Sequence, residues 1–449
     1  MTHHDLLILG GGSGNTVIGP EHDGWDVGIA EPAEFGGTCM NRGCIPSKML
    51  VHAADVSLAA RTGPRLGLRK AADRADWPAV RDRIFDRIDA IAEGGLAYRE
   101  SLDNVTVYRH HARFIGERAV DLDGELVTAD RIVLAIGARS AIPAIPGLVN
   151  APYLTSDDVM RVDQLPEHLV VMGGGFIALE MAHVFDGLGS RVTIVHRGDL
   201  LLRGADEDVR QQLTRSYSER LDLRLETTVE QANHGGQTFS LSLSDGTVLE
   251  GDQLLVATGR IPNGDLADVG VAGIDVDNRG YVITDDRLRT SAESIWALGD
   301  VTNPVQLKHT ANDEARLVAR QLVDPDDQST IDRRFIPHAV FGHPQVGSVG
   351  ATEAELVAAG RPFVKATREY ASTAYGWAME EEAGFAKLLA DSETRLLLGA
   401  HVIGPQAPTL VQQLVQGMAN GLTVDAMAKG QLWIHPAMPE LLEQALLDL

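Results

Sequence analysis

The sequence predicts an α/β fold, in which parallel strands alternate with helices. Two stretches carry this prediction: an apolar strand from Leu6 to Leu9 and another from Leu169 to Met172 each enter a glycine-rich turn. A glycine-rich turn between a strand and a helix is typical of Rossmann-like dinucleotide-binding units, and two such units are far more specific than one. The length of 449 residues allows about three domains.

Composition limits the class of protein. An apolar fraction of 44% and a charged fraction of 23% are ordinary for a globular protein with sizeable cores. The net charge of -24 argues against nucleic acid and against an anionic membrane surface as partners. No apolar run is long enough to span a bilayer, and the N-terminus lacks a signal-peptide pattern. With only two cysteines, we expect a cytoplasmic protein with neither membrane nor nucleic-acid partners.

The first glycine-rich turn, residues 10–14, contains four glycines, of which Gly10, Gly12 and Gly14 are the candidate phosphate contacts. Glycines let the backbone approach a pyrophosphate, and the N-terminus of a following helix attracts its charge. A second strand, from Trp25 to Ala30, ends in Glu31, whose carboxylate is placed to accept hydrogen bonds from a ribose. Two features weaken the pattern: Asn15 replaces the third glycine of the fingerprint, and Gly19-Pro20 should end the helix early.

The stretch from Gly36 to Lys48 contains both cysteines, Cys39 and Cys44, with four residues between them. Cysteines at this spacing can form a disulfide in a slightly distorted helical turn. The loop that such a bridge closes is very short, so its contribution to stability is small. We therefore predict a redox-active dithiol. We expect no metal site, because structural zinc needs four ligands and no further cysteine is available.

The second turn has the fuller GxGxxA fingerprint, in Gly173, Gly175 and Ala178. A helix from Ile177 to Leu188 and a strand from Arg191 to Val195 should follow it. This strand ends at His196 and Arg197 instead of a carboxylate, and Arg203 lies one loop further on. A carboxylate there favours NAD, whereas arginine accommodates the 2′-phosphate of NADP. We expect both arginines to bind NADPH; the alternative is that they are solvated surface side chains.

The remaining chain continues the alternation of strands and helices. Residues 143–147 mark a linker, and the composition shifts at Phe335 to strands with proline and glycine. A short amphipathic helix should end the chain. Other helices are expected over residues 49–60, 77–102, 352–359 and 409–420, and other strands over residues 105–114, 120–122, 131–137, 254–259 and 294–300.

Together these residues resemble the flavoprotein disulfide reductases, the class I pyridine nucleotide-disulfide oxidoreductases, over essentially the whole chain. The markers are residues 36–48, GGGFIALE (173–180), ATGR (257–260), ALGD (297–300) and HPAMPE (435–440). The resemblance implies an FAD-binding domain (1–147), an NADPH-binding domain (148–267), a return segment of the FAD domain (268–333) and an α+β dimer-interface domain (334–449). Three further stretches are similar to the subgroup that reduces mycothiol disulfide: GSGN (12–15), AYGWAME (374–380) and residues 430–449.

Motif matching implies roles for individual residues. Lys48 and Glu180 should form a buried ion pair beside the flavin, with Phe176 covering the nicotinamide pocket. The implied FAD contacts are Gly10, Gly12, Gly14, Glu31, Gly37, Thr38, Lys48, Ala112, Gly137 and Asp300. The implied NADPH contacts are Gly173, Gly175, Phe176, Arg197, Arg203 and Gly259.

The resemblance also implies a reaction, in which NADPH reduces FAD and FAD opens the disulfide. Cys44 should face the flavin, and Cys39 should attack the substrate disulfide as a thiolate. A thiol with a pKa of about 8.5 is mostly protonated at neutral pH, so it needs a base, for which His435 is suited. Glu440 should orient that imidazole. In the family this pair comes from the second subunit, so the active site should require a homodimer.

The substrate stays open at this point. Glutathione reductase, dihydrolipoamide dehydrogenase and mercuric reductase are alternatives to mycothiol disulfide reduction. Dihydrolipoamide dehydrogenase is disfavoured because His196 replaces its usual glutamate, and mercuric reductase because no C-terminal cysteine pair could hold the metal. The non-enzymatic alternative is a flavin-bound redox sensor. The sequence does not identify the groups that would recognise the sugars of mycothiol.

Overall fold

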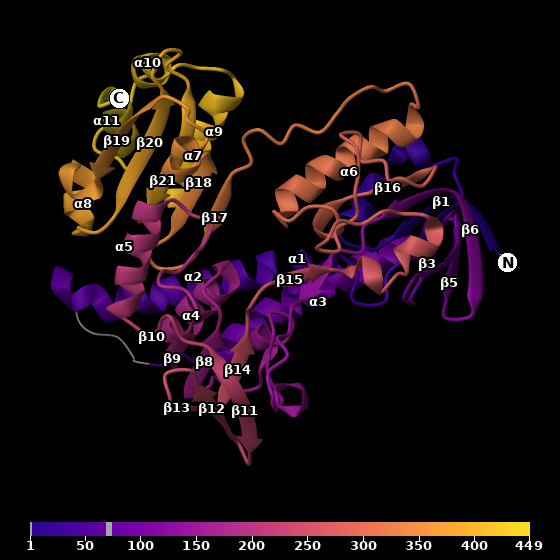
Figure 1. The fold of residues 1–449 in the computed structure, drawn as a ribbon, viewed down its shortest axis with the longest axis horizontal. Helices are drawn as coiled ribbons and strands as arrows, with labels where there is room; N and C mark the ends of the chain where they lie inside the picture. Colours follow the sequence, from indigo (N-terminus) through magenta and orange to yellow (C-terminus); the bar gives the residue numbers. More distant parts are fainter. Residues whose placement is uncertain (1, 69–73) are drawn as a thin grey trace.

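The computed structural model describes residues 2–68 and 74–449. It confirms the predicted fold class, with two Rossmann-like units and an α+β C-terminal region (Figure 1). In Figure 1 the N-terminal sheet lies at the right, the strands of the second unit lie at the lower centre, and the C-terminal sheet lies at the upper left.

The N-terminal sheet combines strands from two distant parts of the chain. Its order is β3-β2-β1-β6-β5-β4, and β16 also pairs with β6. In β1, Leu6 and Ile8 pack on one face with side chains of α6 (Lys308–Val323), whereas Leu7 packs on the other. Because both faces are covered, this parallel strand is a continuous apolar run. The strands are β1 (Thr2–Leu9), β2 (Val27–Ala30), β3 (Val105–Tyr108), β4 (Arg113–Gly116), β5 (Ala119–Leu122), β6 (Glu125–Leu134) and β16 (Ile295–Ala297).

The second unit repeats the strand–turn–helix–strand pattern. β8 is parallel to β9 and β14, and β9 is parallel to β10. A three-stranded antiparallel sheet, β11-β12-β13, packs against β8, with Val170 and Phe239 in one apolar cluster. The elements are β8 (His168–Met172), α4 (Phe176–Leu188), β9 (Arg191–Val195), α5 (Glu207–Ser218), β10 (Asp222–Arg224), β11 (Val229–Gly235), β12 (Thr238–Leu243), β13 (Val248–Gly251) and β14 (Gln253–Val256).

The chain enters and leaves the second unit at one place. β7 (Ala138–Ser140) pairs in antiparallel fashion with β15 (Arg260–Pro262). Arg139 on β7 makes a two-pronged contact with Asp265 just beyond β15, at 2.8 and 2.7 Å. The second unit is therefore an insertion between β7 and β15, after which the chain returns to the first sheet at β16.

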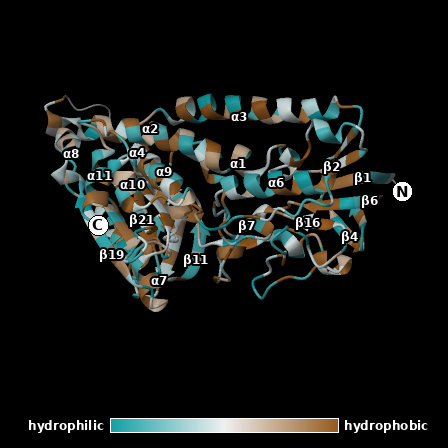
Figure 2. Cartoon of the chain, turned by 90° about the horizontal axis from the view of Figure 1, so that it is seen from above, coloured by the Kyte–Doolittle hydropathy of each residue, from teal (hydrophilic) through white to brown (hydrophobic). Residues whose placement is uncertain are grey.

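Between β2 and β3, the described residues form the α-helices α1, α2 and α3. Leu50 and Ala54 of α2 pack with Ala182 and Phe185 of α4 in a single buried cluster, so α2 bridges the two units. Figure 2 shows α3 along one side of the molecule, with hydrophilic and hydrophobic residues alternating along it. The helices are α1 (Gly37–Asn41), α2 (Cys44–Thr62) and α3 (Trp77–Glu100).

The C-terminal region is a five-stranded antiparallel sheet of order β17-β18-β21-β20-β19. Apolar side chains of α9 and α11, among them Leu414 and Leu442, pack with Val402 of the sheet. The elements are β17 (His338–Val340), β18 (Val346–Gly350), α7 (Glu353–Ala358), β19 (Phe363–Glu369), α8 (Ala374–Met379), β20 (Phe385–Asp391), β21 (Leu397–Ile403), α9 (Ala407–Ala419), α10 (Val424–Lys429) and α11 (Glu440–Leu447).

Three predicted elements differ in the structure. The strand expected over residues 105–114 is two strands, β3 and β4, at opposite ends of the order of the N-terminal sheet. The helix expected after the first glycine-rich turn is only a 3-10 helix, Gly14–Val17, followed by another at Pro20–His22. Proline at position 20 cannot donate the backbone bond that would continue a helix. The strand expected over residues 294–300 is shorter, because β16 ends at Ala297 and Asp300 lies in the 3-10 helix Gly299–Val301.

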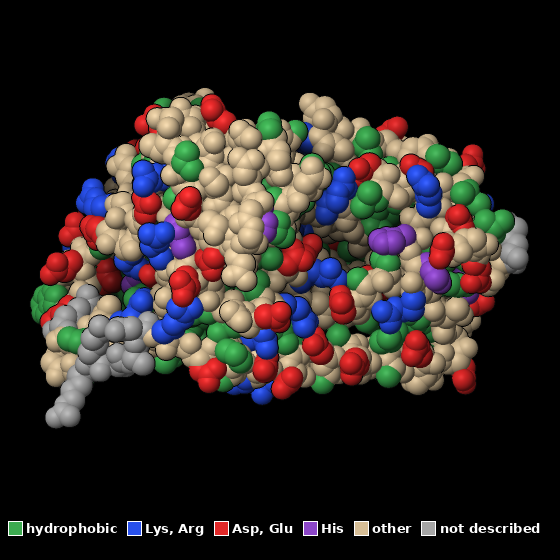
Figure 3. All heavy atoms as spheres, turned by 90° about the horizontal axis from the view of Figure 1, so that it is seen from below, with side chains coloured by type: hydrophobic (Ala, Val, Ile, Leu, Met, Phe, Trp, Pro, Cys, Tyr) green, Lys and Arg blue, Asp and Glu red, His purple; other side chains and the backbone are tan. Residues whose placement is uncertain are grey.

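Charged side chains of both signs are interspersed over the face seen in Figure 3, which is hollowed near its middle. Within residues 2–68 and 74–449, none of the helices combines the length and apolar character that crossing a bilayer requires.

Candidate active site

A cavity of about 960 Å³ lies where the two units and the C-terminal region meet. Both cysteines line it, as do Phe176 and Glu180 of α4. Of the predicted FAD contacts, all except Gly14 lie in its wall: Gly10, Gly12, Glu31, Gly37, Thr38, Lys48, Ala112, Gly137 and Asp300. Tertiary folding has therefore brought together residues from most of the length of the chain.

The first turn forms one end of this cavity. Gly10 has φ of +112°, and a Cβ there would lie 2.3 Å from the carbonyl oxygen of Ala135. Only glycine fits this close approach between the turn and the end of β6. Gly14 packs instead against the sheet, where a Cβ would lie 2.8 Å from the Ala135 Cβ atom.

Glu31 fixes the first turn from the end of β2. Its Oε2 accepts a hydrogen bond of 2.8 Å from the backbone N–H of Gly11, and its Oε1 accepts one of 3.0 Å from Ala33. Asp300 also lines the cavity, and burial raises its pKa, which the nearby Arg260 and Lys308 counteract. The glycine-rich turn, the Glu31 carboxylate after β2 and the buried Asp300 carboxylate are groups that fit FAD in this cavity.

The two cysteines are joined in a disulfide, with 4.6 Å between their Cα atoms. Cys39 lies in α1, and Cys44 begins α2. At the break between the helices, a Cβ on Gly43 would lie 2.8 Å from the Thr38 carbonyl oxygen, so glycine permits the close approach. The cysteine pair thus spans a helix break, in the wall of the cavity.

Asn41 holds the redox stretch in place, although no motif predicts it. Its side-chain amide donates hydrogen bonds to the carbonyl oxygens of Glu34 at 3.0 Å, Phe35 at 3.0 Å and Gly37 at 3.1 Å. Asn41 lies between the two cysteines in the sequence, and its side chain is buried. A buried amide with three backbone acceptors fixes the loop that leads into α1.

Lys48 and Glu180 form the ion pair that the motifs imply. Their Nζ and Oε2 atoms lie 2.5 Å apart, with side-chain exposures of 34% and 4%, so only the glutamate is buried. The other carboxylate oxygen accepts a 3.0 Å hydrogen bond from the backbone N–H of Phe341. The pair therefore joins α2, α4 and the segment after β17 at the cavity wall.

His435 and Glu440 also lie together, in spite of the prolines between them. The imidazole Nδ1 lies 2.5 Å from Oε1 of Glu440, whose Oε2 accepts a 3.1 Å bond from the N–H of Ala437. The hydrogen bond with His435 lowers the pKa of Glu440. The His435 side chain is 72% exposed and is not among the residues that line the cavity.

The second turn lies outside the cavity wall, and its geometry parallels that of the first. Gly173 has φ of +130°, and a Cβ there would lie 2.2 Å from the Ala257 carbonyl oxygen. A Cβ on Gly175 would meet nothing within 4 Å, so the turn presents an open backbone surface. Gly259, at the neighbouring strand end, is similarly open. Bare backbone at a helix N-terminus fits a dinucleotide pyrophosphate.

The arginines near this turn are available for a ligand. Arg197 and Arg203 are both exposed, and neither has a hydrogen-bond or ion-pair partner among the described residues. His196, the residue in place of a carboxylate, packs beneath the turn, where a Cβ on Gly174 would lie 2.7 Å from its Nδ1. Burial lowers the pKa of His196.

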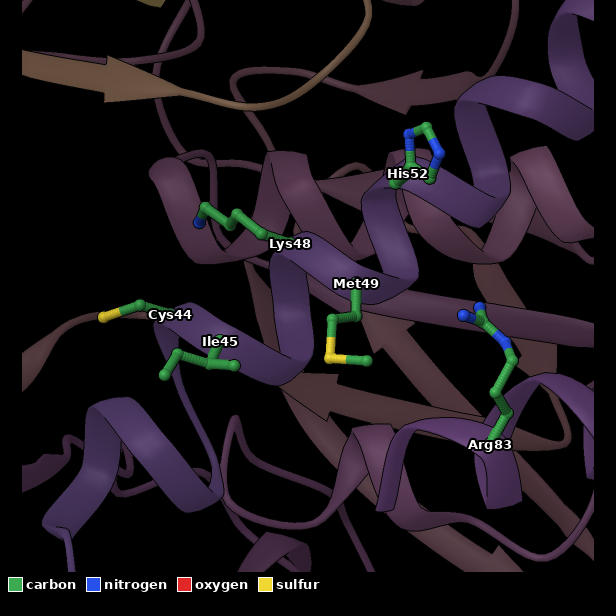
Figure 4. Close-up of a pocket in the computed structure, with 6 residues that line it drawn as sticks. All are labelled: Cys44, Ile45, Lys48, Met49, His52 and Arg83. Carbon is green, nitrogen blue, oxygen red and sulfur yellow. The ribbon is translucent and has the colours of Figure 1, made fainter. Parts of the chain in front are cut away.

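A second, open pocket of about 500 Å³ lies on the outer side of α2. Figure 4 shows its lining side chains along α2, with Arg83 approaching from α3. The lining residues are Cys44, Ile45, Lys48, Met49, His52 and Arg83. The pocket therefore combines apolar side chains, Ile45 and Met49, with basic ones, next to the sulfur of Cys44.

Sequence reasoning missed several residues of the large cavity. Lys308, His309, His338 and Phe341 line it and belong to no motif that was used. Arg260 also lines it, and the ATGR marker could have identified it. The other four come from the return segment and the C-terminal region, whose placement is a tertiary property.

Comparison with known proteins agrees with this geometry. Residues 4–315 match the family described as pyridine nucleotide-disulphide oxidoreductase, and residues 336–446 match its dimerisation domain. A mycothione reductase of Mycobacterium tuberculosis is 46% identical over 459 residues, covering 100% of both chains. A dihydrolipoyl dehydrogenase of Haloferax volcanii is 32% identical and covers 99% of this chain and 96% of its own.

A solved structure gives the same result. The HOCl-induced flavoprotein disulfide reductase RclA from Escherichia coli superposes with a TM-score of 0.88 at 28% identity, over 98% of this chain and 99% of that chain. The cavity, the disulfide and these similarities agree. The chain belongs to the pyridine nucleotide-disulphide oxidoreductases, flavoprotein disulfide reductases that use FAD and NAD(P)H.

Proposed function

We propose that the protein reduces mycothiol disulfide to mycothiol with NADPH, through FAD and the Cys39–Cys44 disulfide. One observation carries the reductase chemistry: this disulfide and the first glycine-rich turn line the same cavity. The full-length identity of 46% with a mycothione reductase supports the substrate.

The proposed domains are the predicted ones: FAD binding over 1–147, NADPH binding over 148–267, a return segment over 268–333 and a dimer interface over 334–449. The pairing of β7 with β15 supports an inserted domain that begins after β7; β15 itself, within 148–267, pairs with a strand of the first domain. The pairing of β16 with β6 supports the return segment.

The chemistry begins at the disulfide. Bound FAD supplies the two electrons from NADPH that break the bond between Cys39 and Cys44. The Cys39 thiolate attacks one sulfur of the substrate disulfide, so that a mixed disulfide forms and the substrate bond breaks. The Cys44 thiolate then attacks the Cys39 sulfur, which restores the original bond and releases the second thiol. Two electrons and two protons are consumed for two thiols formed.

His435 is proposed to carry the protons. Glu440 holds Nδ1, which leaves Nε2 to take the proton from Cys39 and return it to the leaving thiolate. In its own chain this imidazole is mostly exposed, and the apolar neighbours Leu432 and Ile434 are 99% and 75% exposed. Exposed apolar residues flanking the histidine support its insertion into the active site of a second subunit, and hence a homodimer.

Lys48 is proposed to place a positive charge beside the flavin. Lys48 lies four positions after Cys44 in α2, so both lie on the same side of the helix. Glu180 keeps the ammonium group oriented through the 2.5 Å contact. Phe176, at the start of α4 and 44% exposed, is proposed to cover the nicotinamide pocket.

The choice of nicotinamide is proposed to rest on Arg197 and Arg203. Both guanidinium groups are exposed and without partners among the described residues, as a site for a 2′-phosphate requires.

A steady-state comparison tests the proposal. The disulfides of mycothiol, glutathione and lipoamide and the mercuric ion are each supplied with NADPH and with NADH. We expect the largest kcat/KM for mycothiol disulfide with NADPH. A larger value for another acceptor would assign that substrate, and reduction of none of them would favour the redox sensor. Cys39→Ser is the control, because it should keep flavin reduction and lose disulfide reduction.

A further inference from the structure

The two glycine-rich turns differ in the positive charge that they offer a pyrophosphate. The second turn leads into α4, an α-helix of 13 residues. The first leads into a 3-10 helix of 4 residues, whose C-cap Ile18 is already extended. The partial charge at a helix N-terminus arises from aligned peptide dipoles, so one 3-10 turn supplies only a fraction of it. A dinucleotide on the first turn needs positive charge from elsewhere.

One lysine is held against the first turn by a distant part of the chain. Lys308, the first residue of α6, lines the large cavity, and its Nζ donates a 2.8 Å hydrogen bond to Oγ of Ser13. Ser13 follows Gly12 directly, and its hydroxyl lies 3.4 Å from Oδ1 of Asn312, also on α6. The amino terminus of α6 is therefore fixed to the turn by two side-chain contacts.

This lysine has no carboxylate partner. No carboxylate of the described residues lies within ion-pair distance of its Nζ, and burial lowers the pKa of Lys308, against the influence of Asp300. The other cavity-lining cations are already engaged: Arg42 with Glu34, Lys48 with Glu180, Arg139 with Asp265, and Arg260 with the Ala138 carbonyl. A desolvated ammonium group without a counter-ion is costly unless an anion joins it.

We propose that Lys308 binds a phosphate oxygen of FAD next to Ser13 and supplies the positive charge that the truncated helix does not. The lysine comes from the return segment, so FAD joins that segment to the first turn. The proposal rests on FAD binding, which is common to the family, and not on the identity of the disulfide substrate.

The test measures the affinity of the apoprotein for FAD by flavin fluorescence. Lys308→Met removes the charge and keeps most of the side-chain length. Loss of one charge-assisted hydrogen bond should weaken FAD binding by about 10- to 100-fold and reduce its salt dependence. The midpoint potential of bound FAD should not change. Lys429→Met, which removes an exposed lysine on α10, is the charge-matched control and should bind FAD like the unaltered protein.

Two results would overturn the proposal. One is unchanged FAD affinity in Lys308→Met. The other is a shifted midpoint potential, which would assign the charge to the flavin ring instead of the pyrophosphate. Lys308→Gln provides a second neutral side chain if the methionine variant fails to fold. FAD affinity is measured in the absence of any disulfide substrate. Failure of the substrate proposal therefore leaves this result unaffected.

Discussion

The two glycine-rich turns share their backbone geometry but not their surroundings. In both, the first glycine lies against the carbonyl oxygen of the alanine that directly follows the neighbouring strand, where a Cβ would approach to 2.3 Å at Gly10 and 2.2 Å at Gly173. After the second turn an α-helix follows, and after the first only a 3-10 helix. The close approach of turn and strand is therefore common to both units, and the helix that follows the turn is what differs.

Arg99 stabilises the early end of the first helix. Its Nε donates a 2.7 Å hydrogen bond to Oδ1 of Asn15, and its Nη2 donates one of 2.8 Å to the Asn15 carbonyl oxygen. That carbonyl would accept a backbone N–H in a longer helix. Burial lowers the pKa of Arg99. Asn15, which looked anomalous in the fingerprint, is thus the residue through which α3 supports the turn.

The largest effect is expected when a Cβ atom is added to the first glycine of each turn. Gly10→Ala should yield protein without FAD, because the new Cβ overlaps the Ala135 carbonyl oxygen. Gly173→Ala should keep FAD but raise KM for NADPH by about 100-fold or more, since the displaced turn carries the pyrophosphate. Flavin absorbance and steady-state kinetics measure the two effects. Loss of FAD in Gly173→Ala would show that the turns are not independent.

The second unit is also fixed to the C-terminal sheet, through a buried lysine. Lys387 Nζ lies 2.8 Å from Asp206, 2.6 Å from Asp208 and 2.6 Å from Glu353. Lys387→Met should lower the free energy of unfolding by about 3–5 kcal/mol, because Asp206 stays buried without a counter-ion. Urea denaturation measures this, and Lys429→Met should change stability by less than about 1 kcal/mol.

The same variant gives a pH dependence. For Asp206 burial acts to raise the pKa, but the bond from Lys387 and other contacts leave it below the ordinary value. Hydrogen bonds from Lys365 and Lys387 lower the pKa of Glu353. Depressed carboxylate pKa values stabilise the fold above about pH 4, and this contribution is lost as the pH falls through the folded values. The stability difference between the unaltered protein and Lys387→Met should therefore shrink below about pH 4; a constant difference would contradict the ion-pair network.

Arg197→Ala should affect the second turn alone. Loss of a guanidinium contact with the 2′-phosphate should raise KM for NADPH by about 10- to 100-fold and leave KM for NADH unchanged. Arg215→Ala, an exposed arginine of α5 in the same unit, is the matched control. Equal changes with both nicotinamides would remove Arg197 from the 2′-phosphate site.

The smallest effect is expected from a substitution of Arg99, which supports the first turn. Arg99→Met leaves Asn15 without two hydrogen bonds, so FAD affinity should fall by about tenfold, while KM for NADPH stays the same. Fluorescence titration of the apoprotein measures the affinity. Arg87→Met, an exposed arginine on the same helix, should leave FAD binding unaltered.

Local patterns in the sequence predict much of the fold. The apolar runs before both turns are β1 and β8, and the periodicity over residues 77–102 matches α3. Gly19-Pro20 predicted the early end of the helix after the first turn, whereas the turn at Gly299 ends a strand that the sequence pattern extends to Asp300. The spacing of Cys39 and Cys44 predicted a disulfide, and the structure contains it.

The sequence by itself determined the chemistry that short-range geometry carries: two bare turns, a dithiol five positions apart, and a histidine within reach of Glu440. Tertiary structure alone decided which residues far apart in the sequence meet. The contact of Lys308 with Ser13 joins residues 295 positions apart, and Lys387 meets Asp206 across 181. Periodicity and motifs describe neighbours along the chain. A buried charge needs a partner in space, and that partner can be distant in the sequence.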